Sequence, residues 1–260
     1  MAYETIKVTE PLAGVTVISF ARPEVANALS TQMGRELLDV WSQLRADPAL
    51  RCVILAGEGR HFQAGADLKE RNGMSDEAWA EQHRLFEAMI RAQLACPVPI
   101  IAAVHGAAMG GGCEMSLACD FTYAADGARF GLPEAGLGIM PGLGGTQLLT
   151  RAVGPRRALE LLTTAAPFTA AQALEYGLVS GVVPAEALMD TVLVVAAQIA
   201  SRAPLSVRGL KRVVHGGQDL DLKQAMDLEL TVYNQLFTTQ DRREGVASFN
   251  EKRSPAFEGR

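Results

Sequence analysis

The chain has 260 residues, of which 48% are hydrophobic and 20% are charged, and its formal net charge is −5. A chain of this length can bury roughly 75% of the surface that its unfolded form exposes, so a stable core requires neither disulfides nor a structural metal. The excess of acidic over basic side chains argues against a nucleic-acid partner, because affinity for a phosphate backbone depends largely on clustered positive charge.

The two ends of the chain carry no recognisable targeting pattern. Residues 1–10 contain Glu4 and Glu10 and have no apolar core, which argues against a secretory signal and against an Arg-rich transit peptide. The last four residues match no peroxisomal address. We therefore expect a cytoplasmic protein with reduced thiols.

The chain opens with a strand pattern and then changes to a helical one. Residues 5–10 and 15–20 are apolar or alternating around turn residues, which predicts a β-hairpin. From Ser30 to Asp47 the apolar residues recur every three or four positions, which predicts an amphipathic helix with Ser30 as its N-cap.

Two short apolar runs, residues 52–56 and 100–104, predict strands that are buried on both faces of a sheet covered by helices. Between them, residues 75–95 have a helical pattern that begins at a capping serine. Residues 92–113 lack charged side chains and are long enough to suggest a membrane span. Their prolines and three consecutive glycines instead favour a buried strand, a loop and the start of a helix.

Strand patterns nearly vanish after residue 142, apart from residues 178–183, and helical patterns dominate to Arg253. This order predicts an α/β core followed by a helical region. We expect a single functional unit, with residues 1–200 as the core and residues 201–260 as the helical C-terminal region.

The segment Gln63–Glu70 contains small residues followed by Asp67, which has the spacing of a capping box with Glu70. A helix that starts here would present free amides, which attract negative charge. An ordinary tight turn into a helix would have the same pattern.

Three consecutive glycines, Gly110–Gly112, follow the second buried strand and precede another helical pattern. They indicate an unusual backbone or a close approach to the main chain. Close packing of a helix on a strand is the alternative.

Two glutamates, Glu114 and Glu134, occur among apolar residues, where a carboxylate is costly without a purpose or a partner. If they converge, they form an acid and base pair. For Glu134 a structural explanation also remains open, because it follows Pro133 as an acidic residue in a helix's first turn would.

Several other chemistries are disfavoured. Residues 142–147 lack the third glycine of a dinucleotide fingerprint, and no phosphate loop, nucleophile elbow or zincin motif occurs. The four cysteines and four histidines show no zinc-ligand spacing, so we expect no metal.

With these segments in this order, the chain closely resembles the enoyl-CoA hydratase (crotonase) family over nearly its full length. The matching motifs are Arg22–Pro23, Asn27–Leu29, Ala64–Glu70, Gly106–Asp120, Phe130–Glu134, Pro141–Gln147 and Asp241–Gly245. The resemblance implies an α/β fold, a spiral of ββα units with a helical C-terminal trimerisation region. It also implies a homotrimer or homohexamer, an acyl-CoA thioester substrate, and no cofactor beyond the coenzyme A of that substrate.

The resemblance also implies roles for four site residues. The amides of Ala66 and Gly111 would form an oxyanion hole for the thioester oxygen. Glu114 would activate water toward Cβ, and Glu134 would deliver a proton to Cα. Both positions hold glutamate as in the hydratases, whereas members that isomerise, hydrolyse or decarboxylate often lack one of the two. The residues that would bind substrate and CoA are Ala64, Ala66, Asp67, Leu68, Lys69, Gly111, Phe249 and Lys252, of which the last two would reach a neighbouring subunit's CoA.

The predicted activity is therefore hydration of a trans-2-enoyl-CoA. The alternatives are a specialised dehydratase, acting for example on carnitinyl-CoA or aromatic-pathway acyl-CoAs, an enoyl-CoA isomerase, and a non-enzymatic acyl-CoA or RNA binder. Gln63, His105 and Leu132 depart from the commonest hydratase residues, which puts the acyl preference in doubt. Met74, Trp79, Phe86 and Leu143 would line an acyl-tail pocket or belong to the core.

Overall fold

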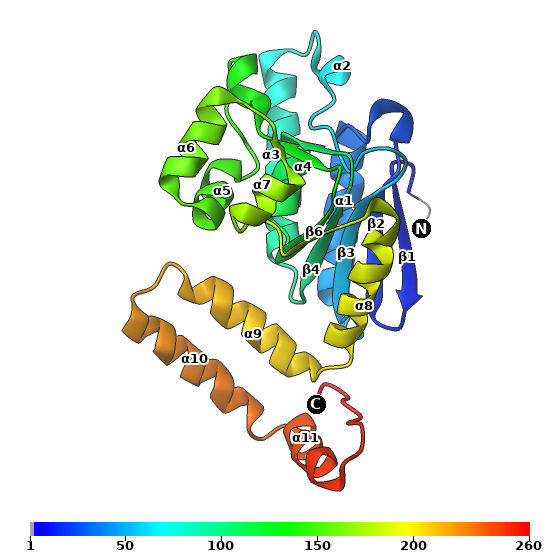
Figure 1. Ribbon diagram of the computed structural model, residues 1–260, viewed down its shortest axis with the longest axis vertical. Helices are drawn as coiled ribbons and strands as arrows, with labels where there is room; N and C mark the ends of the chain where they lie inside the picture. The colour runs from blue at the N-terminus through cyan, green and yellow to red at the C-terminus, as the bar shows by residue number, and fades with distance from the viewer. Residues whose placement is uncertain (1–2) are drawn as a thin grey trace.

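The computed structural model describes residues 3–260, and it is built around a six-stranded sheet (Figure 1). The N-terminal hairpin pairs β1 (Ile6–Leu12) with β2 (Val15–Phe20) in antiparallel fashion, and the remaining strands are parallel to β2. The sheet order is β1-β2-β3-β4-β6-β9. The four parallel strands that follow the hairpin are β3 (Cys52–Gly57), β4 (Ile100–Val104), β6 (Phe121–Ala125) and β9 (Gly181–Val183).

Helices cover both faces of this sheet. Along β3, Val53 and Leu55 belong to a core shared with α1 (Thr31–Ala46) and α3 (Asp76–Leu94). The alternate residue Ile54 belongs to a second core with α8 (Leu188–Ala200). Because successive strand residues point to opposite faces, an apolar run such as β3 is what two covering layers require.

A second, three-stranded sheet has the order β5-β7-β8 and places the two predicted glutamates. β5 (Ala107–Met109) pairs in parallel with β7 (Arg129–Gly131), so the segments that follow both strands begin side by side. Helix α4 (Gly111–Leu117) follows β5, and the short 3-10 helix η2 (Pro133–Leu137) follows β7. This pairing brings Glu114 and Glu134 to one end of the small sheet. The third strand is β8 (Phe168–Thr169), which leads into α7 (Ala170–Glu175).

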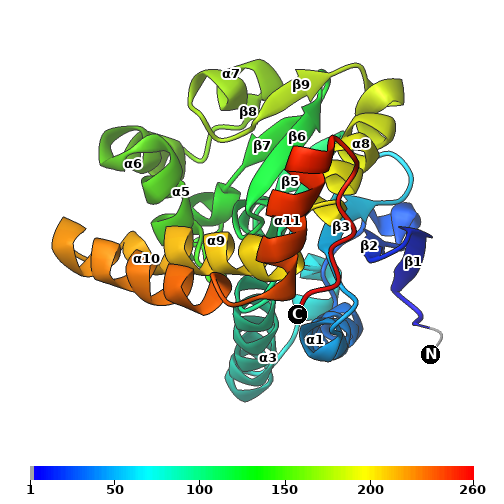
Figure 2. The same ribbon diagram turned by 90° about the horizontal axis from the view of Figure 1, so that it is seen from below.

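The C-terminal helices extend away from the body of the molecule. Figures 1 and 2 show α9 (Pro204–Gly217) and α10 (Leu222–Leu236) as an antiparallel pair, followed by α11 (Gln240–Glu251). Nζ of Lys211 on α9 lies 2.7 Å from Oδ2 of Asp120, which ties the pair to the core. The predicted boundary between residues 200 and 201 falls between α8 and α9, and the division of the chain there stays a prediction.

The structure confirms the predicted hairpin, the helices near residues 30–47 and 75–95, and the two buried strands. The sequence patterns missed the strands β5, β6, β7 and β8, which are two to five residues long. No single helix among residues 3–260 is long and apolar enough to span a membrane, and one helix pair, 185–200 with 204–217, reaches that length and hydropathy only across a 107° bend.

Candidate active site

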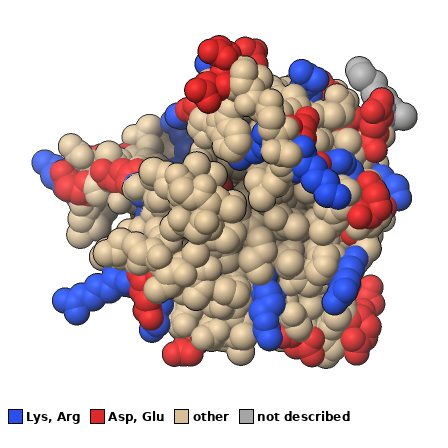
Figure 3. All heavy atoms as spheres, turned by 90° about the horizontal axis from the view of Figure 1, so that it is seen from above, with Lys and Arg blue, Asp and Glu red and all other residues tan. Residues whose placement is uncertain are grey.

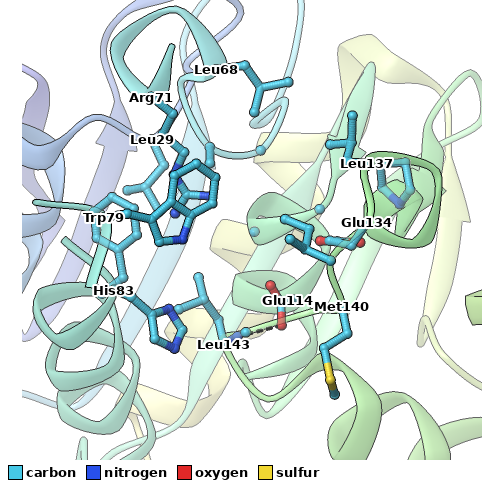
Figure 4. A pocket seen from close by; sticks show the side chains of 18 of the residues that line it. Leu29, Leu68, Arg71, Trp79, His83, Glu114, Glu134, Leu137, Met140 and Leu143 are labelled. Carbon is cyan, nitrogen blue, oxygen red and sulfur yellow. Dashed lines mark hydrogen bonds between the residues drawn. The ribbon is translucent and has the colours of Figure 1, made fainter. Parts of the chain in front are cut away.

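A cavity of about 580 Å³ lies between the α2–α3 segment and the segments that carry the two glutamates (Figure 4). Helix α2 (Leu68–Arg71) is the short helix predicted after Asp67. Six of the predicted site residues line the cavity, namely Ala64, Ala66, Leu68, Gly111, Glu114 and Glu134. Asp67 and Lys69 do not line it. Phe249 and Lys252 lie at the end of α11, outside the cavity, and Phe249 is 83% exposed.

Glu114 is held in a fixed orientation by a loop that precedes α5 (Gly145–Val153). Its side chain is 2% exposed, and its Oε1 accepts hydrogen bonds from the backbone amides of Leu143 at 2.7 Å and Gly145 at 2.8 Å. Burial raises the pKa of this carboxyl to about 7, although these amides oppose the shift. Glu114 is therefore a group that can take up or release a proton near neutral pH.

Gly145 lets the loop approach this carboxylate. A Cβ added at Gly145 would lie 2.9 Å from Oε1 and Cγ of Glu114, so only glycine lets the loop approach so closely. This segment was interpreted as an incomplete dinucleotide motif and as one of the motifs of the family resemblance, and neither interpretation predicted its contact with Glu114. A glycine cluster some thirty residues after a buried glutamate was the available signal.

Glu134 lies across the cavity from Trp79 and His83 (Figure 4). Its side chain is 8% exposed, and its buried Oε2 has no hydrogen-bond partner within residues 3–260. Burial raises its pKa, and a Cβ at Gly110 would come within 3.0 Å of Oε1. Glu134 is also an acidic residue in the first turn of η2, as the structural alternative predicted, and that position aims it into the cavity.

Two backbone amides at the cavity wall have no hydrogen-bond acceptor within residues 3–260. Leu29 and Ala66 form a parallel β-bridge. The bridge consists of two hydrogen bonds from Leu29 to the residues on either side of Ala66: the Leu29 N–H donates to Gly65 O, and the Leu29 carbonyl accepts from Asp67 N. The N–H of Ala66 therefore points away from Leu29. Gly111 is the first residue of α4, where an N–H has no acceptor within the helix. Both residues line the cavity with the two glutamates.

Gln63 connects the two segments that carry these amides. Its carbonyl accepts from Met109 N at 3.0 Å, and its Oε1 accepts from Gly65 N at 2.7 Å. A Cβ at Gly112 would lie 2.2 Å from the Gln63 carbonyl oxygen, so this glycine is required by packing. For a Cβ at Gly111, the closest side chain among residues 3–260 is Leu143, with Cδ1 at 3.4 Å, which is an ordinary contact. Within the triple glycine, close packing thus explains why residue 112 is a glycine. Gly111 instead presents its backbone amide to the cavity.

The capping box predicted for α2 is only half formed. Asp67 Oδ1 accepts from the amides of Lys69 and Glu70, both at 3.2 Å. The Glu70 carboxylate does not return to the Asp67 amide, which donates to the Leu29 carbonyl, and instead accepts from the amide of Thr31 at 2.9 Å. Glu70 therefore caps α1 and ties the two helices together.

Apolar side chains form the rest of the cavity wall. Four side chains were predicted to line an acyl-tail pocket or to belong to the core. Three of them, Trp79, Phe86 and Leu143, line the cavity, and Met74 does not. Seen from above, the surface has a largely uncharged middle with acidic and basic side chains mixed around it, so this face presents no continuous basic surface (Figure 3).

Taken together, two free amides and two buried carboxyls with raised pKa values define a site for acid–base chemistry next to a carbonyl group, whose oxygen the amides would hold. The chain belongs to the enoyl-CoA hydratase/isomerase family, whose model matches residues 10–260. The predicted family is confirmed.

Relatives of this chain share its full length. It is 41% identical over 258 residues to the crotonyl-CoA hydratase of Syntrophomonas wolfei, which covers 99% of both chains. The crystal structure of an enoyl-CoA hydratase from Bacillus anthracis is 41% identical and superposes with a TM-score of 0.97 over 99% of this chain and 100% of that one. Pseudomonas aeruginosa DspI is 32% identical, with a TM-score of 0.93 over 98% and 97% of the two chains. The predicted crotonase-like fold is thereby confirmed.

Proposed function

We propose that this protein is an enoyl-CoA hydratase that adds water reversibly to a trans-2-enoyl-CoA and forms a 3-hydroxyacyl-CoA. The observation that carries the proposal is the meeting of Glu114 and Glu134, both with raised pKa values, in one cavity with the amides of Ala66 and Gly111. Family membership supplies the thioester substrate, and relatives of similar length are named hydratases.

In the proposed reaction, the amides of Ala66 and Gly111 hold the thioester oxygen. Glu114 removes a proton from water as the water oxygen bonds to Cβ, and the electron pair of the double bond moves to form an enolate. Glu134 then donates a proton to Cα, and the thioester carbonyl is restored. One preorganised donor to such an oxyanion is worth about 2.7–4 kcal/mol, and each well-placed acid or base about 100- to 10,000-fold in rate.

The state of the glutamate pair supports this division of roles. The reaction needs one proton shared between the two carboxyls, because one side chain must accept a proton while the other donates one. Burial is the main cause of the raised pKa of Glu114, and the negative charge of Glu134 adds to it. The two amides on Oε1 of Glu114 favour its ionised form, while Glu134 Oε2 has no donor within residues 3–260 that would do the same. This asymmetry supports Glu114 as the base and Glu134 as the acid.

The proposal includes the remaining contacts to coenzyme A, which enters as part of the substrate and is the only cofactor involved. Backbone groups of residues 64–69 bind its adenine and pantetheine arm. In a homotrimer or homohexamer, Phe249 and Lys252 reach the CoA of a neighbouring subunit. The exposed apolar side chains of α9–α11 support an assembly of this kind, among them Leu210, Leu222 and Phe249. The cytoplasmic location also stays a prediction.

The test is the loss of enoyl-thioester absorbance when purified protein is mixed with crotonyl-CoA and longer enoyl-CoAs. We expect hydration by the wild type and losses of at least about 100-fold in kcat for Glu114→Gln and for Glu134→Gln. Glu81→Gln on the exposed face of α3 is the matched control, and circular dichroism shows whether each variant folds. A wild type that leaves every enoyl-CoA unchanged, or that only shifts the double bond, overturns the proposal.

A further inference from the structure

A cationic side chain lies in the wall of the cavity opposite Glu134. Arg71 is the last residue of α2 and lines the cavity beside Trp79, opposite Glu134 and Met140 (Figure 4). Its surroundings on this side are apolar or aromatic and include Leu29 and Phe86. Placing a charged guanidinium group in an apolar wall costs free energy unless the group has a partner.

Two contacts fix the guanidinium in place. Its Cζ lies 4.3 Å from the centroid of the Trp79 ring, in a cation–π arrangement. Its Nε donates a hydrogen bond of 2.7 Å to Oε1 of Gln82, a side chain that is itself buried. Arg71 is therefore held in one orientation before any ligand arrives.

The charge of Arg71 is not neutralised by the protein. No salt bridge to it forms within residues 3–260. The acidic group that acts on it is Glu70, but that carboxylate accepts from the amide of Thr31 and from Nε2 of Gln82, so the Gln82 amide stands between cation and anion. Burial lowers the pKa of Arg71, as expected for a cation withdrawn from water.

The two terminal nitrogens of Arg71 remain available. Within the part of the chain that the structure describes, the guanidinium forms a hydrogen bond only through its Nε, and neither Nη is among the buried atoms that lack a partner. Two parallel N–H donors on a fixed plane are the arrangement that binds a carboxylate through both of its oxygens. A hydrocarbon chain would gain nothing from these donors and would withdraw the cation further from water.

We propose that Arg71 is a specificity-determining residue that selects enoyl thioesters whose acyl chain ends in a carboxylate. The inference rests on the proposed function, because it takes Glu114, Ala66 and Gly111 to mark where the thioester and the double bond lie. The acyl chain then extends from that point toward Trp79 and Arg71. The phosphates of coenzyme A would suit the same guanidinium, so the experiment must separate the two sources of anion.

The experiment compares kcat/KM for pairs of enoyl-CoAs of equal chain length, one ending in a methyl group and one in a carboxylate, such as trans-2-pentenoyl-CoA and glutaconyl-CoA and their longer homologues. We expect the wild type to prefer the carboxylate at one or more lengths. Arg71→Met should lower kcat/KM for that ester by about 10- to 100-fold and change the value for its methyl-ended partner by less than about threefold. Arg91→Met, at a position on α3 that is 73% exposed and outside the cavity, should change neither.

A second arm uses pantetheine thioesters of the same acids, which lack the nucleotide and its phosphates. If Arg71 binds the acyl carboxylate, Arg71→Met weakens turnover of the carboxylate-ended pantetheine ester by a similar factor. If Arg71→Met lowers turnover of all CoA esters equally and of no pantetheine ester, the guanidinium binds a phosphate and the proposal is overturned. A wild type that hydrates crotonyl-CoA without preferring any carboxylate-ended ester also overturns it.

Failure of the proposed function can be distinguished from failure of the inference about Arg71. If no enoyl-CoA is hydrated, dissociation constants of saturated acyl-CoAs with methyl and carboxylate ends, measured by calorimetry for wild type and Arg71→Met, still decide the role of Arg71. Tighter binding of the carboxylate ester that disappears in Arg71→Met supports the inference, and equal binding of both esters refutes it.

Discussion

The loop before α5 makes a sharp prediction about Glu114. In Gly145→Ala, the added methyl group would lie 2.9 Å from Oε1 and Cγ of Glu114 and 2.9 Å from Cβ of Pro141. Real side chains do not tolerate such contacts, so either the loop or the carboxylate must move. The hydrogen bond from Gly145 N to Oε1, now 2.8 Å, is the first interaction to be lost.

The cost follows from the charge on the acceptor. A hydrogen bond to an ionised group contributes about 1.5–3 kcal/mol, and loss of that amount from the oriented base lowers kcat by about 10- to 150-fold. Removing an amide that favours the ionised form also raises the pKa of Glu114 further. We therefore expect Gly145→Ala to lower kcat for enoyl-CoA hydration and to shift the acidic limb of its pH profile upward.

The assay is the hydration of crotonyl-CoA measured across a range of pH, with circular dichroism and thermal melting to verify folding. Gly127→Ala is the matched control, because a Cβ at Gly127 would meet no atom within 4 Å and its φ is not in the left-handed region. A folded Gly145→Ala protein with kcat and pH profile within about twofold of the wild type would refute the reasoning that this glycine serves Glu114.

Other predictions concern titration and stability. Because burial raises the pKa of Glu114, the proposed base, to about 7, we expect kcat/KM to rise as pH passes through about 7; a flat profile would contradict this. The pKa of Glu114 is about 7 in the folded protein and 4.5 in the unfolded chain, so the folded state binds more protons between these pH values. The free energy of unfolding therefore decreases as pH rises from 4.5 to 7. Glu114→Gln, which keeps an oxygen acceptor for both amides, should therefore raise the free energy of unfolding at pH 8 by up to about 3 kcal/mol and much less at pH 4, measured by urea titration. Lys211→Met removes the 2.7 Å partner of Asp120, which keeps His215 Nε2 and the Ile100 amide, both at 2.6 Å. The loss of this hydrogen bond between charged groups should lower that free energy by about 1.5–3 kcal/mol, while the exposed Arg151→Met should cost less than about 1 kcal/mol. Equal effects would show that the α9 tether is unimportant.

The predictable parts of the fold are those with strong local patterns. Ser30 and Ser75 cap α1 and α3 as expected, because their hydroxyls accept from the third amide of each helix. The strands β5 and β7 have three residues each and carry no alternation that a sequence window could detect. They exist because they pair with each other and with neighbouring segments, which is a property of the tertiary fold.

The candidate site was predictable where a residue type was unusual in its surroundings. Glu114 and Glu134 stood out among apolar neighbours, and the structure places both in the cavity. The contribution of Gly145 depends on a contact across 31 residues, so no local pattern reveals it. Arg71 was missed because an arginine at the end of a charged helical turn is ordinary in sequence, and only the fold turns it toward a cavity.

Gln63 separates the part of the cavity that holds the two amides from the wall formed by α2 and α3. Its main-chain hydrogen bonds join the segment before Ala66 to the strand before Gly111, and its side chain bonds to Gly65 within its own segment, so the spacing of the two amides is set within a buried junction. The opposite wall, with Trp79 and Arg71, belongs to α2 and α3 and takes no part in that junction. If the proposed roles hold, substitutions along those helices would change which acyl chains bind, while the spacing of the two amides would stay the same.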